Sequence, residues 1–456
     1  MSVLYSKEPE EAGSFNKKDF GKDFKWGVST AAYQIEGGHR ADGKGSSIWD
    51  IFTGKRGKVY LGQNGNIACD FYNKYEEDLN LMKNLNIQNF RFSISWSRVI
   101  PSGVGAPNPE GINFYNRLID KCHELDIEPW VTLYHWDLPY ALEQQGGWTN
   151  REIIDWFKEY VALCVKSFGD RVKNWMVLNE PLVFVGAGYF LGIHAPGKKG
   201  MKNFLPAMHH AALCQAEGAR IIKQHFPLAQ VGTTFSCSLI EPLRPNVKDK
   251  LAAKRIDALV NRLFIEPALG LGYPVEDLEF LKKLEKYQLP GDKELLKFDF
   301  DFIGVQNYTR EIVRHFWLVP FVKARNIKAE KRKVPLTAMN WEIYPESIYE
   351  MLKKFNSYKG VGKIYVTENG AAFEDSLEKD EINDNRRINY LREYLAAVLK
   401  AKQEGVNVQG YFVWTFIDNF EWAEGFRPRF GLVHVDFKTQ KRTVKASGKW
   451  YSNFLR

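Results

Sequence analysis

Cysteine is scarce in this chain of 456 residues, which has only five, and no two of them form a Cys-x-x-Cys pair. They are odd in number and widely spaced, at Cys69, Cys122, Cys164, Cys214 and Cys237. Such usage argues against a disulfide framework and against zinc or redox chemistry by paired thiols. We therefore expect reduced cysteines and neither a metal nor another cofactor.

Long apolar runs are also missing. A membrane-spanning helix needs about 18 or more consecutive apolar residues, and no such stretch occurs in the chain. Residues 1–25 are polar and charged, and they lack the apolar centre of a signal peptide. We expect a cytoplasmic protein without a membrane partner.

The excess of one charge sign is small for this length, with 63 basic against 55 acidic side chains and a net charge of +8. Much of the excess lies in segment 323–333, which holds six basic residues and one acid, Glu330. Runs of this kind are most often solvated loops. Because no aromatic residues interleave with the basic ones, we expect no nucleic-acid partner.

What the chain does have is a regular alternation of apolar and amphipathic segments. Eight apolar, strand-like runs cover residues 24–32, 88–96, 127–137, 172–181, 231–242, 301–309, 363–370 and 408–422. Helical patterns separate them, at 75–85, 111–125, 152–168, 204–226, 252–269, 345–355 and 385–404, and a last one starts at Ala446. The middles of the apolar runs are continuous rather than alternating, which is typical of parallel strands buried on both faces.

This alternation predicts the fold. No Pro/Gly/Ser-rich linker, repeat or low-complexity segment divides the sequence, and its 45% hydrophobic residues can fill a large core. We predict an α/β protein with one domain, residues 1–456, built as a single (β/α)8 TIM barrel with elongated βα loops. A doubly wound sheet is the alternative.

Polar side chains gather where the apolar runs end. In a barrel of this kind the ends of different strands meet at one face and carry the functional groups. The predicted strand ends supply Gln34, Arg91, His135, Asn179, Glu180, Tyr308, Glu368, Trp414, Glu421 and Trp422. Amides and carboxylates match hydroxyl groups, and indole faces match the C–H faces of a sugar ring, so this inventory favours a polyhydroxylated ligand.

Two of these residues, Glu180 and Glu368, are carboxylates at the end of an apolar run. Pro181 should bias the backbone of Glu180 toward the extended region, and the Asn369-Gly370 turn ends the run directly after Glu368. Either glutamate alone could be a carboxylate that pairs with an arginine at the barrel mouth. Two acids among partners suited to a sugar instead favour a division of acid and base roles between them.

Five segments, in this order along the chain, resemble the signature segments of glycoside hydrolase family 1, the β-glucosidase type of retaining (β/α)8 enzyme. They are AAYQIEG (31–37), RFSISWSR (91–98), NEP (179–181), TENG (367–370) and DNFEW (418–422). Any one of them is weak evidence, whereas five in the expected order, each at a predicted strand end, are strong. The resemblance covers nearly the whole chain, from Phe24 to Leu432.

The resemblance implies roles for the two glutamates and their neighbours. Glu180 would be the general acid and then the general base, and Glu368 the nucleophile that forms a covalent glycosyl-enzyme. Asn179 would bind the 2-hydroxyl of the sugar, while Arg91 and Tyr308 would hold Glu368 in position and ionised.

The resemblance also implies a sugar site and a leaving-group site. The remaining hydroxyls would be bound by Gln34, His135, Glu421 and Trp422. Trp414 would form the floor of the sugar site, and Trp341 would be the aromatic platform for the leaving group. The expected substrates are small β-glycosides and short oligosaccharides, first of all β-glucosides, with side activity on β-galactosides and β-fucosides.

Three alternatives stay open at this point. A 6-phospho-β-glucosidase is disfavoured because an anionic Glu421 would repel a 6-phosphate. A non-catalytic glycan-binding barrel is disfavoured because both glutamates are present. A transglycosylase would use the same intermediate, and sequence does not separate it from a hydrolase.

Two positions depart from the family pattern and point to an altered leaving-group preference. Leu182 stands where the family often has tryptophan, and Gln306-Asn307-Tyr308 replaces the usual Asn-Tyr-Tyr. Segment 323–333 falls in the long loop after the sixth strand. We expect it to edge the entrance of the cleft and to disfavour cationic leaving groups.

Overall fold

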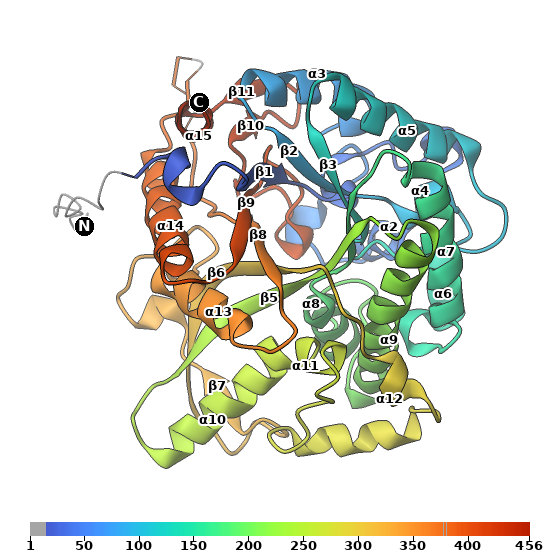
Figure 1. The fold of residues 1–456 in the computed structure, drawn as a ribbon, viewed down its shortest axis with the longest axis vertical. Helices are drawn as coiled ribbons and strands as arrows, with labels where there is room; N and C mark the ends of the chain where they lie inside the picture. The colour runs from blue at the N-terminus through green and yellow to red at the C-terminus, as the bar shows by residue number, and fades with distance from the viewer. Residues whose placement is uncertain (1–14, 377, 380) are drawn as a thin grey trace.

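The computed structural model describes residues 15–376, 378–379 and 381–456. Eight parallel strands form a closed barrel with helices around it (Figure 1). Hydrogen-bonded neighbours follow the order β5-β4-β3-β2-β1-β9-β8-β6, and the pairing of β5 with β6 closes the ring. The predicted (β/α)8 TIM barrel is confirmed, and the doubly wound alternative is excluded.

The barrel strands lie within the predicted apolar runs or overlap them closely. They are β1 (Lys25–Ser29), β2 (Asn89–Ser93), β3 (Glu128–Tyr134), β4 (Asn174–Asn179), β5 (Gln230–Pro242), β6 (Phe302–His315), β8 (Lys363–Asn369) and β9 (Val408–Trp414). Three short strands lie outside the ring, namely β7 (Ala324–Asn326), β10 (Val433–Val435) and β11 (Arg442–Val444).

In the described part of the chain, seven helices surround the strands, namely α3 (Phe71–Asn84), α5 (Pro109–Glu124), α7 (Ile153–Phe168), α9 (Met201–His225), α13 (Glu346–Asn356), α14 (Asn385–Gln403) and α15 (Ala446–Phe454). The other α-helices sit in the loops and, apart from the 11-residue α10, are short, namely α1 (Ala32–Ile35), α2 (Ile48–Thr53), α4 (Trp96–Val99), α6 (Tyr140–Gln144), α8 (Pro181–Val185), α10 (Val247–Asp257), α11 (Ile265–Ala268) and α12 (Asp292–Leu295). The loops are therefore elongated, as predicted.

Helix α5 illustrates how the sequence fixes these elements. Pro109 occupies its first turn, where the missing N–H has no helical partner to lose. Phe114, Leu118 and Cys122 recur every four residues and are all buried. This spacing places them on one face, which packs toward the barrel.

The interior of the barrel is filled by a layer of large side chains, Trp130, Met176, Phe302, Tyr365 and Phe412. The ring centroid of Trp130 lies 4.8 Å from that of Tyr365 and 5.1 Å from that of Phe412. Arg91 adjoins this layer, because its Nε donates to Met176 Sδ at 3.2 Å. The polar site therefore begins directly on an apolar plug that excludes water.

Strands β5 and β6 are 13 and 14 residues long, against five to seven for the other barrel strands. Beyond a register shift at residues 237–239 they stay paired, from Leu239 opposite Arg310 to Pro242 opposite Val313. We call residues 239–242 and 310–315 the β5–β6 extension. Helix α10 packs against it, and β7 pairs antiparallel with its end (Figure 1).

The predicted helix at 252–269 is wrong in its extent. Helix α10 begins earlier, at Val247, and ends at Asp257, and a π-helical turn follows at Ala258–Arg262. The cause is Asn261, whose side chain bonds both the N–H and the carbonyl of Ser238 in β5. A wider turn presents this side chain to the strand, so the regular helix does not continue.

The predicted strand at 408–422 is too long, since β9 ends at Trp414. The next residues leave the sheet and cross over β1: the Thr415 hydroxyl donates to the carbonyl of Ser29 at 2.7 Å, and the N–H of Phe420 donates to the carbonyl of Gln34 at 3.2 Å. Aromatic residues here pack in a loop rather than in a strand, which apolar content alone does not reveal.

In the described part of the chain, no helix combines the length and the apolar character needed to cross a membrane. All five cysteines are buried and free.

Candidate active site

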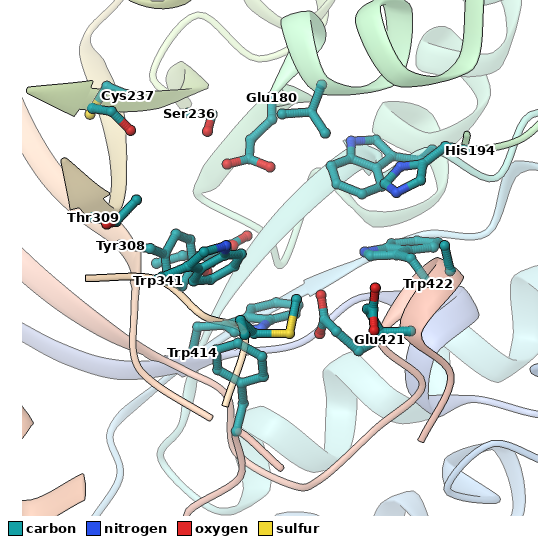
Figure 2. Close-up of a pocket in the computed structure, with 18 of the residues that line it drawn as sticks. Glu180, His194, Ser236, Cys237, Tyr308, Thr309, Trp341, Trp414, Glu421 and Trp422 are labelled. Atoms are coloured by element: carbon teal, nitrogen blue, oxygen red, sulfur yellow. The ribbon is translucent and has the colours of Figure 1, made fainter. Parts of the chain in front are cut away.

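The polar strand ends surround a pocket of about 490 Å³ at the mouth of the barrel (Figure 2). Eight of the predicted site residues line it: His135, Glu180, Tyr308, Trp341, Glu368, Trp414, Glu421 and Trp422. Gln34, Arg91 and Asn179 do not line it but lie fully buried behind it, in contact with residues that do. The structure thus brings the whole predicted set together.

Glu368, the next-to-last residue of β8, is held by donors from two other strands. Arg91 Nη1 in β2 lies 2.5 Å from its Oε1, and the Tyr308 hydroxyl in β6 donates to its Oε2 at 2.7 Å. Gln306 Nε2, also in β6, donates to Oε1 at 2.9 Å. These bonds leave the carboxylate one orientation and favour its charged form.

Glu180 sits in a different local structure, the turn between β4 and α8. Its φ of 45° and ψ of 63° are left-handed, so the predicted extended backbone is wrong. Pro181 takes the first position of α8, where its ring is favourable, and the reversal from strand to helix then requires a positive φ just before it. The N–H of Glu180 bonds the carbonyl of Thr234 at 3.0 Å, which holds this conformation. The strain costs about 1–3 kcal/mol.

The two carboxyl groups differ in proton affinity. Burial raises the pKa of Glu180 well above its usual range, and the neighbouring charge of Glu368 raises it further. Burial also raises the pKa of Glu368, but Arg91, Tyr308 and Gln306 act against this. The surroundings therefore favour the proton on Glu180 and the negative charge on Glu368.

Asn179, the residue before Glu180, links the donors of Glu368 to His135. Its Oδ1 accepts from Arg91 Nη2 at 2.5 Å, from Gln306 Nε2 at 2.8 Å and from the Thr234 hydroxyl at 3.0 Å. Its amide nitrogen lies 3.0 Å from His135 Nε2. Because Oδ1 already accepts three hydrogen bonds, only the amide nitrogen of Asn179 is left to donate to a ligand hydroxyl.

His135 packs between two indoles. Its ring lies 6.1 Å from that of Trp414 and 5.9 Å from that of Trp422, both at interplanar angles of 27°. Burial, together with the charge of Arg91, lowers the pKa of His135 well below its usual range. A neutral imidazole among aromatic faces suits a hydroxylated ring rather than an anion.

Gln34 and Glu421 form a second polar wall. Gln34 Nε2 bonds the Phe420 carbonyl at 2.9 Å, Asn419 Oδ1 at 3.1 Å and Glu421 Oε2 at 3.4 Å. Gln34 Oε1 has no partner within the described residues, so it is the free acceptor of this side chain. Burial and the charge of Glu368 raise the pKa of Glu421 to about 8.

Trp341 closes the opposite part of the pocket, where its ring lies 5.3 Å from Tyr308 and 6.1 Å from Phe430. The next residue, Glu342, is buried and ion-paired. Arg310 Nη2 lies 2.8 Å from its Oε1, and Arg332 Nη1 lies 2.5 Å from its Oε2. Trp341 thus stands on an anchored loop.

No residue of segment 323–333 lines the pocket, although its Asn326 bonds Glu311, which does, so the predicted effect of the segment on cationic leaving groups gains no support from the lining. Arg332 is occupied by Glu342, and the lysines of the segment are exposed. The run mostly behaves as a solvated loop, and its one half-buried cation, Arg332, supports a structural ion pair.

Sequence reasoning missed the contribution of the fifth strand. Ser236 and Cys237 of β5 and the following Ser238 line the pocket (Figure 2), and Ser236 lowers the pKa of Glu180 through a hydrogen bond. The rule that every strand end faces the site would have found them, since small polar residues interrupt the apolar run there. Gln306, a polar residue at the sixth strand end and a departure from the family pattern, bonds both Glu368 and Asn179.

Comparison with known proteins gives three concordant matches. The sequence model of Glycosyl hydrolase family 1 matches residues 16–456. β-Glucosidase A of Thermotoga maritima is 43% identical over 443 residues, which are 97% of this chain and 98% of that protein. β-Glucosidase A of Acetivibrio thermocellus is 41% identical over 97% of this chain and 99% of that protein.

Solved structures agree with the sequence matches. The β-glucosidase from Thermotoga maritima in complex with deoxynojirimycin superposes with a TM-score of 0.92 at 43% identity. The match covers 95% of this chain and 98% of that chain.

Proposed function

The chain belongs to glycosyl hydrolase family 1, and from this membership and the geometry of its pocket we propose that it is a retaining β-glucosidase. It hydrolyses terminal β-D-glucosyl residues of small glycosides and short oligosaccharides. The observation that carries the proposal is the unequal pair of glutamates: Glu368 is fixed by three donors that favour its charged form, whereas burial and the charge of Glu368 raise the pKa of Glu180.

In the first step an oxygen of Glu368 attacks the anomeric carbon while Glu180 gives its proton to the departing glycosidic oxygen. The product is an ester between the sugar and Glu368. In the second step Glu180, now ionised, takes a proton from water, and the water oxygen displaces Glu368 from the anomeric carbon. Two inversions retain the β configuration.

The residues around the pair assign the sugar. Asn179 donates to the 2-hydroxyl, where a hydrogen bond gains strength as positive charge develops on the ring. His135, Gln34 and Glu421 bind the other hydroxyls, and the indole faces of Trp414 and Trp422 pack on the ring. Trp341 receives the leaving group.

A 6-phosphorylated substrate is not favoured. Glu421 stands where the sugar ends, and among the described residues that line the pocket there is neither lysine nor arginine. A phosphate placed there would lose its hydration without gaining a cationic partner, so its desolvation free energy would not be offset.

A covalent trap tests the proposal. A 2-deoxy-2-fluoro-β-D-glucoside with a dinitrophenyl leaving group should inactivate the enzyme and add one sugar to its intact mass, because the fluorine slows the second step more than the first. Digestion should place the sugar on the peptide that holds Glu368. Inactivation without an adduct, or an adduct on another peptide, would contradict the mechanism.

Two further measurements complete the test. Nitrophenyl β-D-glucoside should be hydrolysed far faster than its 6-phosphate, and the reverse order would favour the phosphoglycosidase. The products of a reaction in cellobiose should be mainly glucose, whereas a dominant trisaccharide product would favour transglycosylation.

We also propose that the protein works in the cytoplasm. All five cysteines are free and buried, the state expected in a reducing compartment. Fractionation of cells that express the chain should find its activity with cytoplasmic markers.

A further inference from the structure

Among the described residues that line the pocket there are several acids but neither lysine nor arginine. Besides the three glutamates already described, Glu311 and Glu424 line it. Glu424 forms an ion pair with Arg427. Glu311 forms no ion pair with any described residue, and its carboxylate accepts a hydrogen bond from the side-chain amide of Asn326.

The cations near Glu311 are committed to other acids. Arg310 Nη2 lies 2.8 Å from Glu342, and Arg310 Nη1 lies 2.7 Å from Glu241. Arg332, whose charge lowers the pKa of Glu311, lies 2.5 Å from Glu342. Glu241 and Glu342 therefore bind these two guanidinium groups, and neither arginine forms an ion pair with Glu311, the carboxylate that lines the pocket.

The position of Glu311 on the β5–β6 extension places it on the leaving-group side. Thr309 of the same strand, with Ser236 and Cys237 of β5, lies across the pocket from Glu421 and Trp422 (Figure 2). With the sugar against Trp422, a leaving group extends toward the strand pair that carries Glu311. Burial raises the pKa of Glu311, and Arg332 acts against this rise.

We propose that Glu311 selects the leaving group by charge, so that the enzyme favours β-glucosides whose aglycone carries an ammonium group over those whose aglycone carries a carboxylate. The inference rests on the proposed β-glucosidase function. An uncompensated carboxylate at a partly buried mouth attracts a cation and repels an anion across a medium less polar than water.

Three glucosides of similar shape test the assignment: 4-(aminomethyl)phenyl, 4-(hydroxymethyl)phenyl and 4-carboxyphenyl β-D-glucoside. Selectivity is kcat/KM for the ammonium compound divided by kcat/KM for the carboxylate. Dividing the wild-type selectivity by that of a variant cancels the intrinsic reactivity of the leaving groups. Glu311→Gln should lower the selectivity about tenfold, and Glu311→Lys should lower it further.

Salt provides a second measure. The wild-type selectivity should shrink in about 0.5 M sodium chloride, because ions screen the charge of Glu311, whereas the selectivity of Glu311→Gln should change little. A structural defect in the variant would not reproduce this difference.

Glu330→Gln is the matched control, since Glu330 is an exposed acid in the neighbouring loop and does not line the pocket. Its selectivity should equal that of the wild type. Unchanged selectivity in Glu311→Gln, or an equal loss in Glu330→Gln, would overturn the role of Glu311 and leave the proposed function intact. Failure of the wild type on all three glucosides would contradict the proposed function itself.

Discussion

Glu368 and Glu180 are the same type of residue at the ends of two barrel strands, yet their surroundings are opposite. Glu368 lies within strand β8, where the pairing with β6 and β9 shifts register, and receives three donors from β2 and β6. Glu180 occupies a left-handed turn, and Ser236 is the hydrogen-bond partner that lowers its pKa. The comparison teaches that neighbouring strands, rather than the glutamates themselves, decide which acid attacks and which one carries the proton.

Of the substitutions considered, removal of the attacking carboxylate of Glu368 should lower the activity most. Glu368→Gly should lower kcat by about 10⁴-fold or more, because no other described group can form the ester. Added azide should restore turnover and give the α-glucosyl azide, since it attacks from the vacated side. Formation of the β-azide, read by NMR, would mean that the roles of the two glutamates are reversed.

Glu180→Gln should have a smaller and substrate-dependent effect. Loss of the proton donor should lower kcat/KM by about 10³-fold for cellobiose, but much less for a dinitrophenyl glucoside, whose leaving group needs no proton. Azide should here give the β-glucosyl azide. A loss that is equal for both substrates would remove proton donation from Glu180; Glu152→Gln, an exposed acid, is the control.

Tyr308→Phe tests how the difference in proton affinity arises. The Tyr308 hydroxyl donates to Glu368 and lowers its pKa, so its loss should raise that pKa. The acidic limb of the profile of kcat/KM against pH should move to higher pH, and the rate at neutral pH should fall about tenfold. An unmoved acidic limb would show that Tyr308 does not support the charge of Glu368.

Glu342→Gln should have the smallest effect on activity, because Glu342 contacts neither catalytic glutamate and acts only through the position of its neighbour Trp341. Two arginines would lose their shared carboxylate, and the loop that holds Trp341 would be less fixed. We expect about a threefold rise in KM for aryl glucosides with little change in kcat. A fall in kcat with unchanged KM would instead assign Glu342 to the reacting groups.

The barrel was predictable because its apolar runs are continuous and regularly spaced, and seven of the eight strand ends were predicted to carry polar groups. The left-handed backbone of Glu180 was not predictable, because the rule that a residue before proline is extended describes only an average preference. Here the strand-to-helix reversal and the bond to Thr234 override it.

Other features depend on contacts between distant segments. The π-helical turn at Ala258–Arg262 exists because Asn261 reaches Ser238 in another element. The neutralisation of Arg332 depends on Glu342, which a count of basic residues in one window ignores. Local sequence gives the propensity of each segment but not the partner that decides its final form.

The β5–β6 extension has an evolutionary consequence. From residue 239 on, its two strands pair with each other, β6 also pairs with β7, and α10 packs against both; its Glu311 takes no part in the hydrogen bonds that fix Glu180 and Glu368. Substitutions in this segment can change which glucosides are used while leaving bond cleavage untouched. Bond cleavage thus depends on the strand ends of the barrel, whereas leaving-group preference can evolve separately in the β5–β6 extension.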